Sequence, residues 1–236
     1  MDKVTAVLTS CKRPDLLEQT LDSFFKQNTY PIQKFIIIDD GMDTGCNDFV
    51  NTRYAQHLGT SLYPFTQFTL IYNQVKIRQI RSIDLAYSFV ETDYIFHMEE
   101  DWLFLRPLFI EHSMDIMKED ADIITVWLRS PSDKTLHHTY SKETYHSKNR
   151  IAYKKCDIQY PNGFWNGFTL NPSLKRMVDY NRVKPYQDLP RLTPDQQSGG
   201  NPLECDISVA YAQLGYHAVT LLDQYIEHIG WERHVI

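Results

Sequence analysis

Short apolar runs alternate with segments whose apolar residues recur every three or four positions. The run 4–9 (VTAVLT) predicts a buried strand, and Pro14 suits the first turn of a helix that ends before Asn28. A second apolar run, 34–38, ends at the turn-forming sequence Asp-Asp-Gly. A strand, a helix and a strand in this order predict an α/β fold with a doubly wound, mostly parallel sheet flanked by helices.

The same alternation continues along the rest of the chain. Further strands are expected at 68–72, 93–98, 122–128, 164–170 and 217–222. Further helices are expected at 46–57, 76–90, from Pro107 onward, 172–181 and 203–214. The aperiodic stretches 129–161 and 183–202 predict long loops. We find no repeat or clear linker, and expect a single domain over 1–236, with a nucleotide-binding half of about 1–101 and an acceptor half of about 102–236.

Charge and composition narrow the classes of partner. The net charge is −6 and the 24 Lys and Arg residues are scattered, which disfavours nucleic acid and anionic membrane surfaces as partners. The sequence shows neither a signal peptide nor a transmembrane segment, although peripheral membrane contact stays possible. None of the four cysteines forms a CxxC pair, so reduced thiols are favoured over a disulfide framework or a zinc site. We therefore expect a cytoplasmic protein.

Polar side chains follow the first two predicted strands. Thr9, Ser10 and Arg13 come after the first, and Asp39 and Asp40 end the second. Ligands of open parallel sheets bind beyond the carboxyl ends of the strands, and a carboxylate there can accept from a base N–H or a ribose hydroxyl. These residues predict a nucleoside site, but Asp-Asp-Gly alone also suits an ordinary turn.

Three acids, Glu99, Glu100 and Asp101, follow the apolar strand 93–98. Adjacent carboxylates repel one another unless a cation is present, and oxygen ligands suit Mg²⁺ and Mn²⁺. A divalent ion here would neutralise charge on a bound diphosphate. The alternative is a solvated acidic turn, and the apolar residues 102–105 that follow favour the metal site.

Two further candidates lie nearer the C-terminus. Glu204 and Asp206 open a predicted helix, where either carboxylate is a candidate general base, although acids in a first helical turn are favoured whatever the function. His228 stands in the C-terminal tail, where a neutral imidazole is able to bind a metal or serve a purely structural role.

In this order, these stretches resemble the glycosyltransferases of the GT-A fold, in particular the inverting family 2-like enzymes. The matching stretches are 4–10 with 13–14, 36–41, the helix 76–90, 95–101, 166–170, 204–206 and 215–216. They cover nearly the whole chain apart from the two long loops. The resemblance implies transfer of one sugar from a nucleoside-diphosphate sugar to a hydroxyl of a glycan or other acceptor, with inversion and with Mn²⁺ or Mg²⁺ as cofactor.

The resemblance also implies a role for individual residues. The nucleotide would contact Thr9, Ser10, Arg13, Asp39, Asp40 and Arg78. Asp101 would be the main metal ligand where the family has its DxD motif, with Glu99 near the sugar or the metal's water shell and His228 as a further ligand. Glu204 would be the base, with Asp206 as its rival. On the acceptor side stand Trp165 and Asn166, and the aromatic residues Tyr160, Phe164 and Phe168 are either stacking or core residues.

Two features depart from the family pattern, because Glu99 and Glu204 stand where Asp is commoner. Rival functions also stay open. A sugar-phosphate nucleotidyltransferase usually has a glycine-rich loop after its first strand, which 10–14 lacks. A non-catalytic nucleotide- or carbohydrate-binding module is a second alternative. A Rossmann dehydrogenase is disfavoured because no GxGxxG follows the first strand.

Overall fold

The computed structural model of the protein describes residues 2–42, 45, 47–133, 140–156, 166–193 and 202–231. The chain forms two compact units: Met1–Leu108 with Ile226–Ile236 make the first, and Phe109–Tyr225 make the second. The single domain expected for 1–236 stays a prediction.

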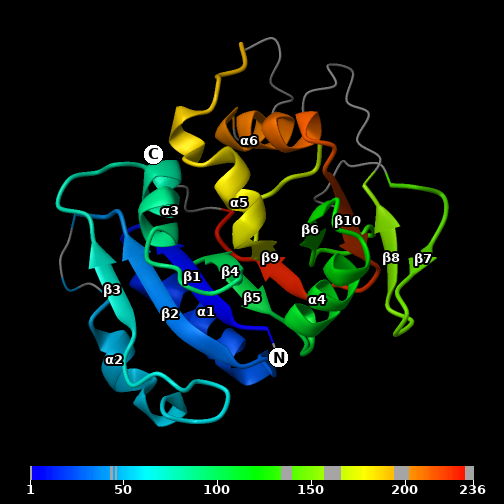
Figure 1. The fold of residues 1–236 in the computed structure, drawn as a ribbon. Helices are drawn as coiled ribbons and strands as arrows, with labels where there is room; N and C mark the ends of the chain where they lie inside the picture. The colour runs from blue at the N-terminus through cyan, green and yellow to red at the C-terminus, as the bar shows by residue number, and fades with distance from the viewer. Residues whose placement is uncertain are drawn as a thin grey trace. The chain divides into compact units, whose positions relative to one another are not determined.

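The sheet of the first unit is parallel. Its strands lie side by side in the order β3 (Thr69–Tyr72), β2 (Ile32–Asp39), β1 (Val4–Ser10) and β4 (Tyr94–Glu99) (Figure 1). Every residue of β1 is buried, as expected for a central strand covered on both faces. The α/β fold with a mainly parallel sheet flanked by helices is therefore confirmed.

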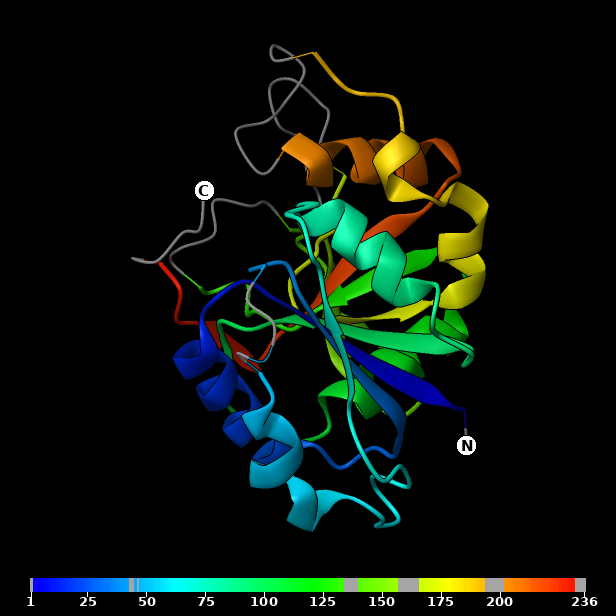
Figure 2. The same cartoon turned by 90° about the vertical axis from the view of Figure 1, so that its left-hand side faces the viewer.

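Two helices cover opposite faces of this sheet (Figure 2). α1 (Pro14–Gln27) begins with proline and buries Leu17, Leu21 and Phe24. α3 (Gln79–Tyr87) packs on β1 and β2. The chain passes from β1 outward to β2 and β3 and then returns to β4 on the other side of β1. Right-handed crossovers in opposite directions place their helices on opposite faces.

The helix expected over 46–57 is shorter than predicted. The structure has α2 (Phe49–Arg53) and then a 3₁₀ turn, η1 (Ala55–His57). Between them, Tyr54 leaves helical geometry with φ −103° and ψ 10°. Its ring stacks on Phe25 at 5.0 Å and its hydroxyl donates to Asp22 at 2.8 Å. These tertiary contacts offset the local helical preference.

A two-stranded antiparallel ribbon that the sequence did not predict completes the first unit. β5 (Trp102–Phe104) follows β4 almost directly and pairs with β11 (Ile226–His228). Ile226 lies opposite Phe104 and His228 lies opposite Trp102. The ribbon therefore brings the C-terminal tail beside the acidic cluster that follows β4.

The second unit has its own mixed sheet, in the order β6 (Ile123–Trp127), β10 (His217–Leu221), β8 (Ala152–Lys155) and β7 (Tyr145–His146). β6 and β10 are parallel, whereas β10–β8 and β8–β7 are antiparallel. The remaining elements of this unit are the helices α4 (Phe109–Glu119), α5 (Met177–Val183), η2 (Tyr186–Asp188) and α6 (Pro202–Gln213), and the strand β9 (Ser173–Arg176).

Three expectations for the second unit need correction. The loop expected over 129–161 contains β7 and β8. Residues 166–170, expected as part of a strand, belong to no helix or strand. The helix expected over 172–181 is instead β9 followed by α5. Ser173, Leu174 and Lys175 are all buried, and the Lys175 ammonium donates to the Thr169 carbonyl oxygen at 2.8 Å, so tertiary contacts decide the extended geometry here.

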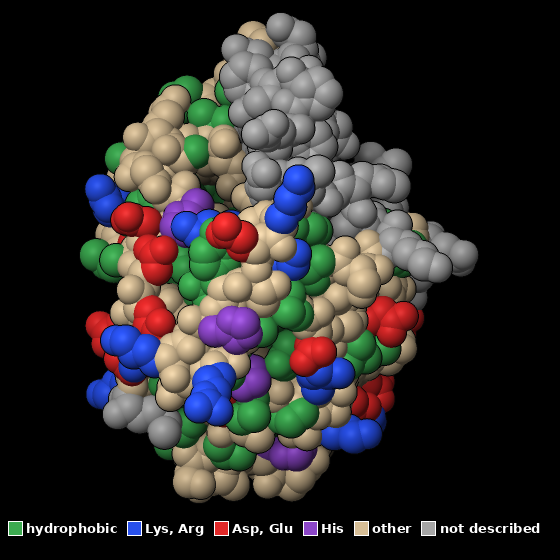
Figure 3. All heavy atoms as spheres, turned by 90° about the vertical axis from the view of Figure 1, so that its right-hand side faces the viewer, with side chains coloured by type: hydrophobic (Ala, Val, Ile, Leu, Met, Phe, Trp, Pro, Cys, Tyr) green, Lys and Arg blue, Asp and Glu red, His purple; other side chains and the backbone are tan. Residues whose placement is uncertain are grey.

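Figure 3 shows one face of the molecule, on which the visible acidic and basic side chains are interspersed and gather into no broad patch of one sign. Within the described ranges, no helix has both the length and the apolar character needed to cross a bilayer.

Candidate nucleotide and metal site

The predicted donor-site residues of the first unit meet at one edge of its sheet. Ser10, the last residue of β1, lies opposite Asp39 of β2, and Thr9 lies opposite Glu99 of β4. The carboxyl ends of parallel strands share an edge, so residues far apart in sequence become neighbours.

Asp39 is fully engaged in holding this edge together. It is 1% exposed, and its carboxylate accepts from the Ser10 hydroxyl at 3.0 Å, the Asn47 amide at 2.9 Å and the Gly41 N–H at 2.6 Å. A Cβ at position 41 would lie 2.6 Å from Asp39 Oδ1 and 2.4 Å from Cγ of Lys12, so only glycine fits. Asp39 thus fixes the turn after β2, and Thr9 beside it is buried.

Asp40 holds the loop that leads into α3. Its Oδ1 accepts from the Asn73 amide at 2.8 Å and the Ile77 N–H at 2.9 Å, and its Oδ2 accepts from the Arg78 N–H at 2.7 Å. Arg78 has φ 71° and ψ 163°, a conformation that is costly for any residue except glycine. The Arg78 side chain is exposed at the start of α3. Asp40 therefore stabilises a strained backbone that presents a cationic side chain.

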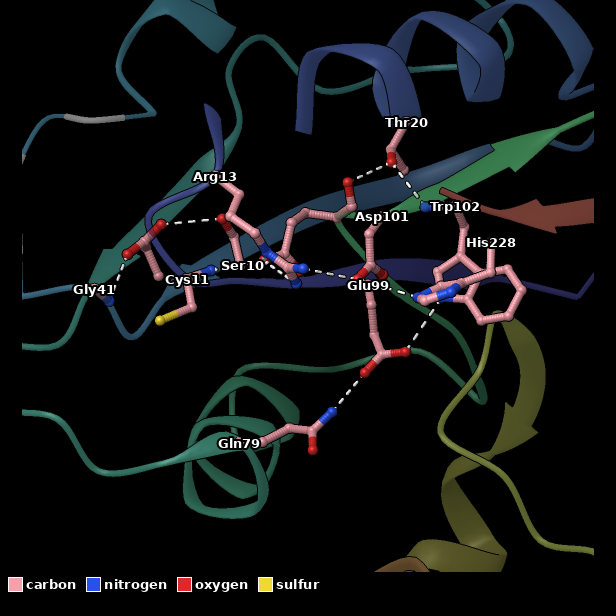
Figure 4. A network of polar contacts seen from close by, with 12 residues as sticks. Ser10, Cys11, Arg13, Thr20, Gly41, Gln79, Glu99, Asp101, Trp102 and His228 are labelled. Atoms are coloured by element: carbon pink, nitrogen blue, oxygen red, sulfur yellow. Dashed lines mark hydrogen bonds and ion pairs between the residues drawn. The ribbon is translucent and has the colours of Figure 1, made fainter. Parts of the chain in front are cut away.

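Arg13 links the loop after β1 to the acidic cluster after β4 (Figure 4). Its Nε and Nη2 lie 2.8 and 2.7 Å from Oε1 of Glu100, and its Nη1 lies 2.9 Å from Oδ2 of Asp101. The structure thus places Asp101 directly at the edge where β1 and β2 end.

His228 approaches Asp101 from the opposite side (Figure 4). Its Nε2 lies 3.3 Å from Asp101 Oδ2, while the Ile229 N–H donates to the Asp101 carbonyl oxygen at 2.9 Å. The imidazole packs against Trp102, with ring centroids 4.8 Å apart, and edge-on against Trp231. The pairing of β5 with β11 therefore positions His228.

Glu99 faces neutral donors. Its Oε1 accepts from the Gln79 amide at 2.5 Å, and its Oε2 accepts from the Trp102 indole N–H at 3.3 Å (Figure 4). Both carboxylate oxygens of Glu99 already accept a hydrogen bond. The geometry therefore does not support Glu99 as a second carboxylate ligand, beside Asp101, of one metal ion.

The donors fit a divalent cation with two protein ligands. No group of three His, Cys, Asp or Glu side chains suited to a metal occurs in the described part of the chain. Two ligands each about 2.1 Å from one ion lie about 3 Å apart, which is close to the 3.3 Å between His228 Nε2 and Asp101 Oδ2. Oδ1 of Asp101 has no partner among the described residues. Mg²⁺ and Mn²⁺ commonly complete such a site with water and substrate phosphates.

The two carboxyl groups that contact Arg13 have pKa values shifted in opposite directions. Burial raises the pKa of Glu100 to about 7, although the Arg13 guanidinium pulls it down. Burial also acts to raise the pKa of Asp101, but the contact with His228 and the charge of Arg13 outweigh it and hold that pKa below its usual range. Asp101 is therefore the carboxylate that stays ionised at neutral pH.

In the second unit, the two candidate bases on α6 are bound differently. Glu204 is half-buried, and its Oε1 accepts from the Thr169 hydroxyl at 2.9 Å and the Leu170 N–H at 2.5 Å. Asp206 is 3% exposed and uses both oxygens, one with Arg191 at 2.8 Å and one with the Leu192 N–H at 2.8 Å. Within the described residues, Glu204 alone of the two keeps an oxygen without a donor.

The predicted acceptor residues are only partly described. Trp165, Tyr160 and Phe164 lie outside the described residues, whereas the Asn166 N–H donates to the Ser208 hydroxyl oxygen at 2.8 Å. Phe168 is 1% exposed beneath the Lys175 ammonium, so it is a core residue.

The sequence alone did not reveal the roles of four residues that contribute to these sites. Glu100 anchors Arg13, Gln79 holds Glu99, Lys175 supports the Thr169 segment, and Gly230 packs against Asp101. For the contact between the tail and Asp101, the glycine at position 230 was the only signal in the sequence, because glycine permits close approach of another chain segment. The others depend on pairings between distant segments.

Comparisons with known proteins agree with this arrangement. A search of solved structures finds the mannosyltransferase PcManGT from Pyrobaculum calidifontis in complex with GDP-Man and Mn²⁺, with a TM-score of 0.65 and 15% identity. It also finds S. aureus TarS in complex with UDP-GlcNAc, with a TM-score of 0.61 and 12% identity. The matches cover 98% and 100% of this chain but only 58% and 62% of those chains, and at these identities they show the fold alone.

Among curated proteins, none matches the chain significantly. The family described as Glycosyl transferase family 2 matches residues 5–179, which is more than half of the sequence. That range includes β1 to β4 and the acidic cluster whose geometry is described above. The similar solved structures are glycosyltransferases of the GT-A type. The chain therefore belongs to glycosyl transferase family 2.

Proposed function

We propose that the chain transfers a single hexose-type sugar from a nucleoside-diphosphate sugar to an acceptor hydroxyl, with inversion and with Mn²⁺ or Mg²⁺. The observation that carries this proposal is the position of Asp101, which contacts both Arg13 and His228 at the edge where β1 and β2 end. PcManGT and TarS, which have this fold, are described in complex with GDP-Man and UDP-GlcNAc.

The residues of the first unit bind and orient the donor. Asp39 and Asp40 hold the two strand-end loops, and the exposed side chain of Arg78 is available to the diphosphate. Asp101 and His228 would hold the divalent ion. When bound, that ion neutralises charge on the departing diphosphate.

In the second unit, Glu204 is the proposed general base. Its Oε1 is anchored by Thr169 and Leu170, which fixes the carboxylate, and its Oε2 has no donor among the described residues. Oε2 accepts the proton of the acceptor hydroxyl, whose oxygen attacks the anomeric carbon as the bond to the diphosphate breaks. Attack opposite the leaving group inverts the anomeric configuration. Positioning supplies much of the rate.

The test is turnover with a panel of UDP-, GDP- and dTDP-sugars in the presence of Mn²⁺. We expect slow release of nucleoside diphosphate, with water as the acceptor, and a sugar that NMR first detects with inverted configuration. Asp101→Asn should lower the rate at least about a hundredfold, because the loss of metal-assisted charge neutralisation is worth several kcal/mol. Asp22→Asn, a surface carboxylate beside Arg53, is the matched control and should keep full activity.

Other outcomes would identify the rival functions. Pyrophosphate release from a nucleoside triphosphate and a sugar phosphate would indicate a nucleotidyltransferase. Calorimetric binding of nucleotide without any turnover would indicate a binding module. Equal turnover by Asp101→Asn and the unsubstituted chain would refute the metal assignment.

A further inference from the structure

One guanidinium serves two carboxylates at the proposed metal site. Arg13 contacts Glu100 through Nε and Nη2 and Asp101 through Nη1. The side chains of all three residues are largely withdrawn from solvent, with exposures of 13%, 4% and 10%. Ion pairs buried in this way are screened by salt and water far less than surface ion pairs. The charges of Arg13, Glu100 and Asp101 therefore influence any ion that binds nearby.

Glu100 fixes the position of Arg13. Oε1 of Glu100 also accepts from the Cys11 N–H at 2.9 Å, and the Glu100 carbonyl oxygen accepts from the Thr20 hydroxyl at 2.6 Å. The Thr20 hydroxyl oxygen in turn accepts from the Trp102 N–H at 3.2 Å. These contacts hold the guanidinium beside Asp101, and Figure 4 shows Arg13, Thr20 and Trp102 around it.

Asp101 is the point of competition. Its Oδ2 already faces both Arg13 and His228, which are the cation and the imidazole of the site. A divalent ion on this carboxylate would lie close to the guanidinium, and the two positive charges would repel each other. A bound diphosphate would offset that repulsion, because its negative charge attracts both.

We propose that Arg13 is an internal counter-cation of the acidic cluster, which weakens binding of the free divalent ion and so makes tight metal binding depend on the nucleoside diphosphate. This inference rests on the proposed function. Its physical content is that Arg13 and the metal share the charge of Asp101 and that Glu100 keeps Arg13 in place.

The experiment is a titration of the protein with Mn²⁺, in which electron paramagnetic resonance measures the free ion with and without UDP or GDP. It is run at about pH 8, above the pKa of about 7 of Glu100. The informative variant is Arg13→Gln with Glu100→Gln. It removes the buried pair together, so neither partner is left unpaired, and it conserves the net charge of the cluster.

We expect the double variant to bind Mn²⁺ alone at least about tenfold more tightly than the unsubstituted chain. The extra affinity that nucleoside diphosphate gives should shrink by the same factor, because a bound diphosphate already offsets the repulsion by Arg13 and Mn²⁺ affinity in its presence should change little. Arg53→Gln is the matched control, since Arg53 also pairs with two carboxylates, Glu18 at 2.7 Å and Asp22 at 3.0 Å, but lies on the surface. It should leave Mn²⁺ binding unchanged.

The outcomes separate this inference from the proposed function. If the unsubstituted chain binds Mn²⁺ and the double variant binds it equally or more weakly, Arg13 is no counter-cation, while metal-dependent transfer stands. If the unsubstituted chain binds no Mn²⁺ even with nucleoside diphosphate while the double variant does, the dependence on nucleoside diphosphate is wrong and metal dependence of the natural chain fails. If neither binds Mn²⁺ under any condition, both are wrong. A folded double variant, verified by circular dichroism, is required in each case.

Discussion

At the scale of single residues, Glu204 and Asp206 differ in what their oxygens already hold. Glu204 uses one oxygen for Thr169 and Leu170, whereas Asp206 uses both for Arg191 and Leu192. A base must have a lone pair available to the proton it accepts. This difference favours Glu204 as the base and gives Asp206 a structural role.

Glu204→Gln should lower kcat by about 10²- to 10⁴-fold and leave donor affinity unchanged, because glutamine keeps the anchoring oxygen but cannot accept the proton. Asp206→Asn should instead lower the free energy of unfolding by about 1–3 kcal/mol, because buried partners lose a charged acceptor. Steady-state rates, calorimetric donor binding and thermal melts distinguish the two variants. A larger kcat loss in Asp206→Asn would reverse the assignment.

The pH dependence of turnover should report Glu204. Burial raises its pKa, although Leu170, Thr169 and the charge of Lys175 act to lower it. A base must be deprotonated, so kcat should fall as the pH drops through this raised pKa, above the usual range for glutamate. Lys175→Met should move that acid limb to higher pH. A profile of kcat against pH measures this shift. If the acid limb of Lys175→Met lies at the same pH as that of the unsubstituted chain, the charge of Lys175 does not act on the pKa of the base.

At the scale of elements, the loop entering α3 combines a strained backbone with a candidate donor-site residue. Asp40 accepts from the N–H groups of Ile77 and Arg78, which holds Arg78 at φ 71°. A residue with a side chain in this conformation costs about 1–3 kcal/mol. Strain of this kind persists only where surrounding contacts enforce it, and here it directs Arg78 outward at the start of a helix.

Substitutions at Arg78 should separate the effect of the strained backbone on stability from the effect of the guanidinium on donor binding. Arg78→Gly should raise the melting temperature because glycine adopts this backbone conformation freely, whereas Arg78→Ala should not. The difference in unfolding free energy should be about 1 kcal/mol. Both variants should lose donor affinity equally if the guanidinium contacts the diphosphate. Thermal melts and calorimetry provide the two measurements, and unchanged affinity in both would remove Arg78 from the donor site.

The β5–β11 ribbon sets the distance between the tail and Asp101. A Cβ at position 230 would lie 2.4 Å from Oδ2 and 2.8 Å from Cβ of Asp101. Gly230→Ala should therefore displace the tail or the carboxylate, weaken Mn²⁺ binding measured by titration, and cost about 1–3 kcal/mol of stability. Gly59→Ala is the control, because its Cβ meets nothing within 4 Å. It should lower stability through its φ of +71° without changing Mn²⁺ affinity.

At the scale of the whole molecule, the sequence predicts what depends on local periodicity. The apolar runs give β1, β2 and β4, and parallel strands bring their polar ends together, so Ser10 beside Asp39 could be expected. Pairings between segments far apart in the sequence could not be predicted in this way. Nothing local in 102–104 or 226–228 specifies the ribbon, and three adjacent acids do not show that two of them, Glu100 and Asp101, contact Arg13. Short strands such as β9 depend on tertiary contacts more than on propensity.

Binding of nucleotide and metal should stabilise the folded chain. A ligand present at about 100 times its Kd adds about 2.7 kcal/mol, which should raise Tm by about 5–10 °C in a chain of this size. We expect UDP or GDP with Mn²⁺ to raise Tm more than the sum of either alone, because an ion held by Asp101 would also attract the diphosphate. Differential scanning fluorimetry measures these shifts and would also rank UDP and GDP by the Tm increase that each gives. In Asp101→Asn the extra shift should vanish, and equal shifts with and without Mn²⁺ in the unsubstituted chain would contradict a shared site.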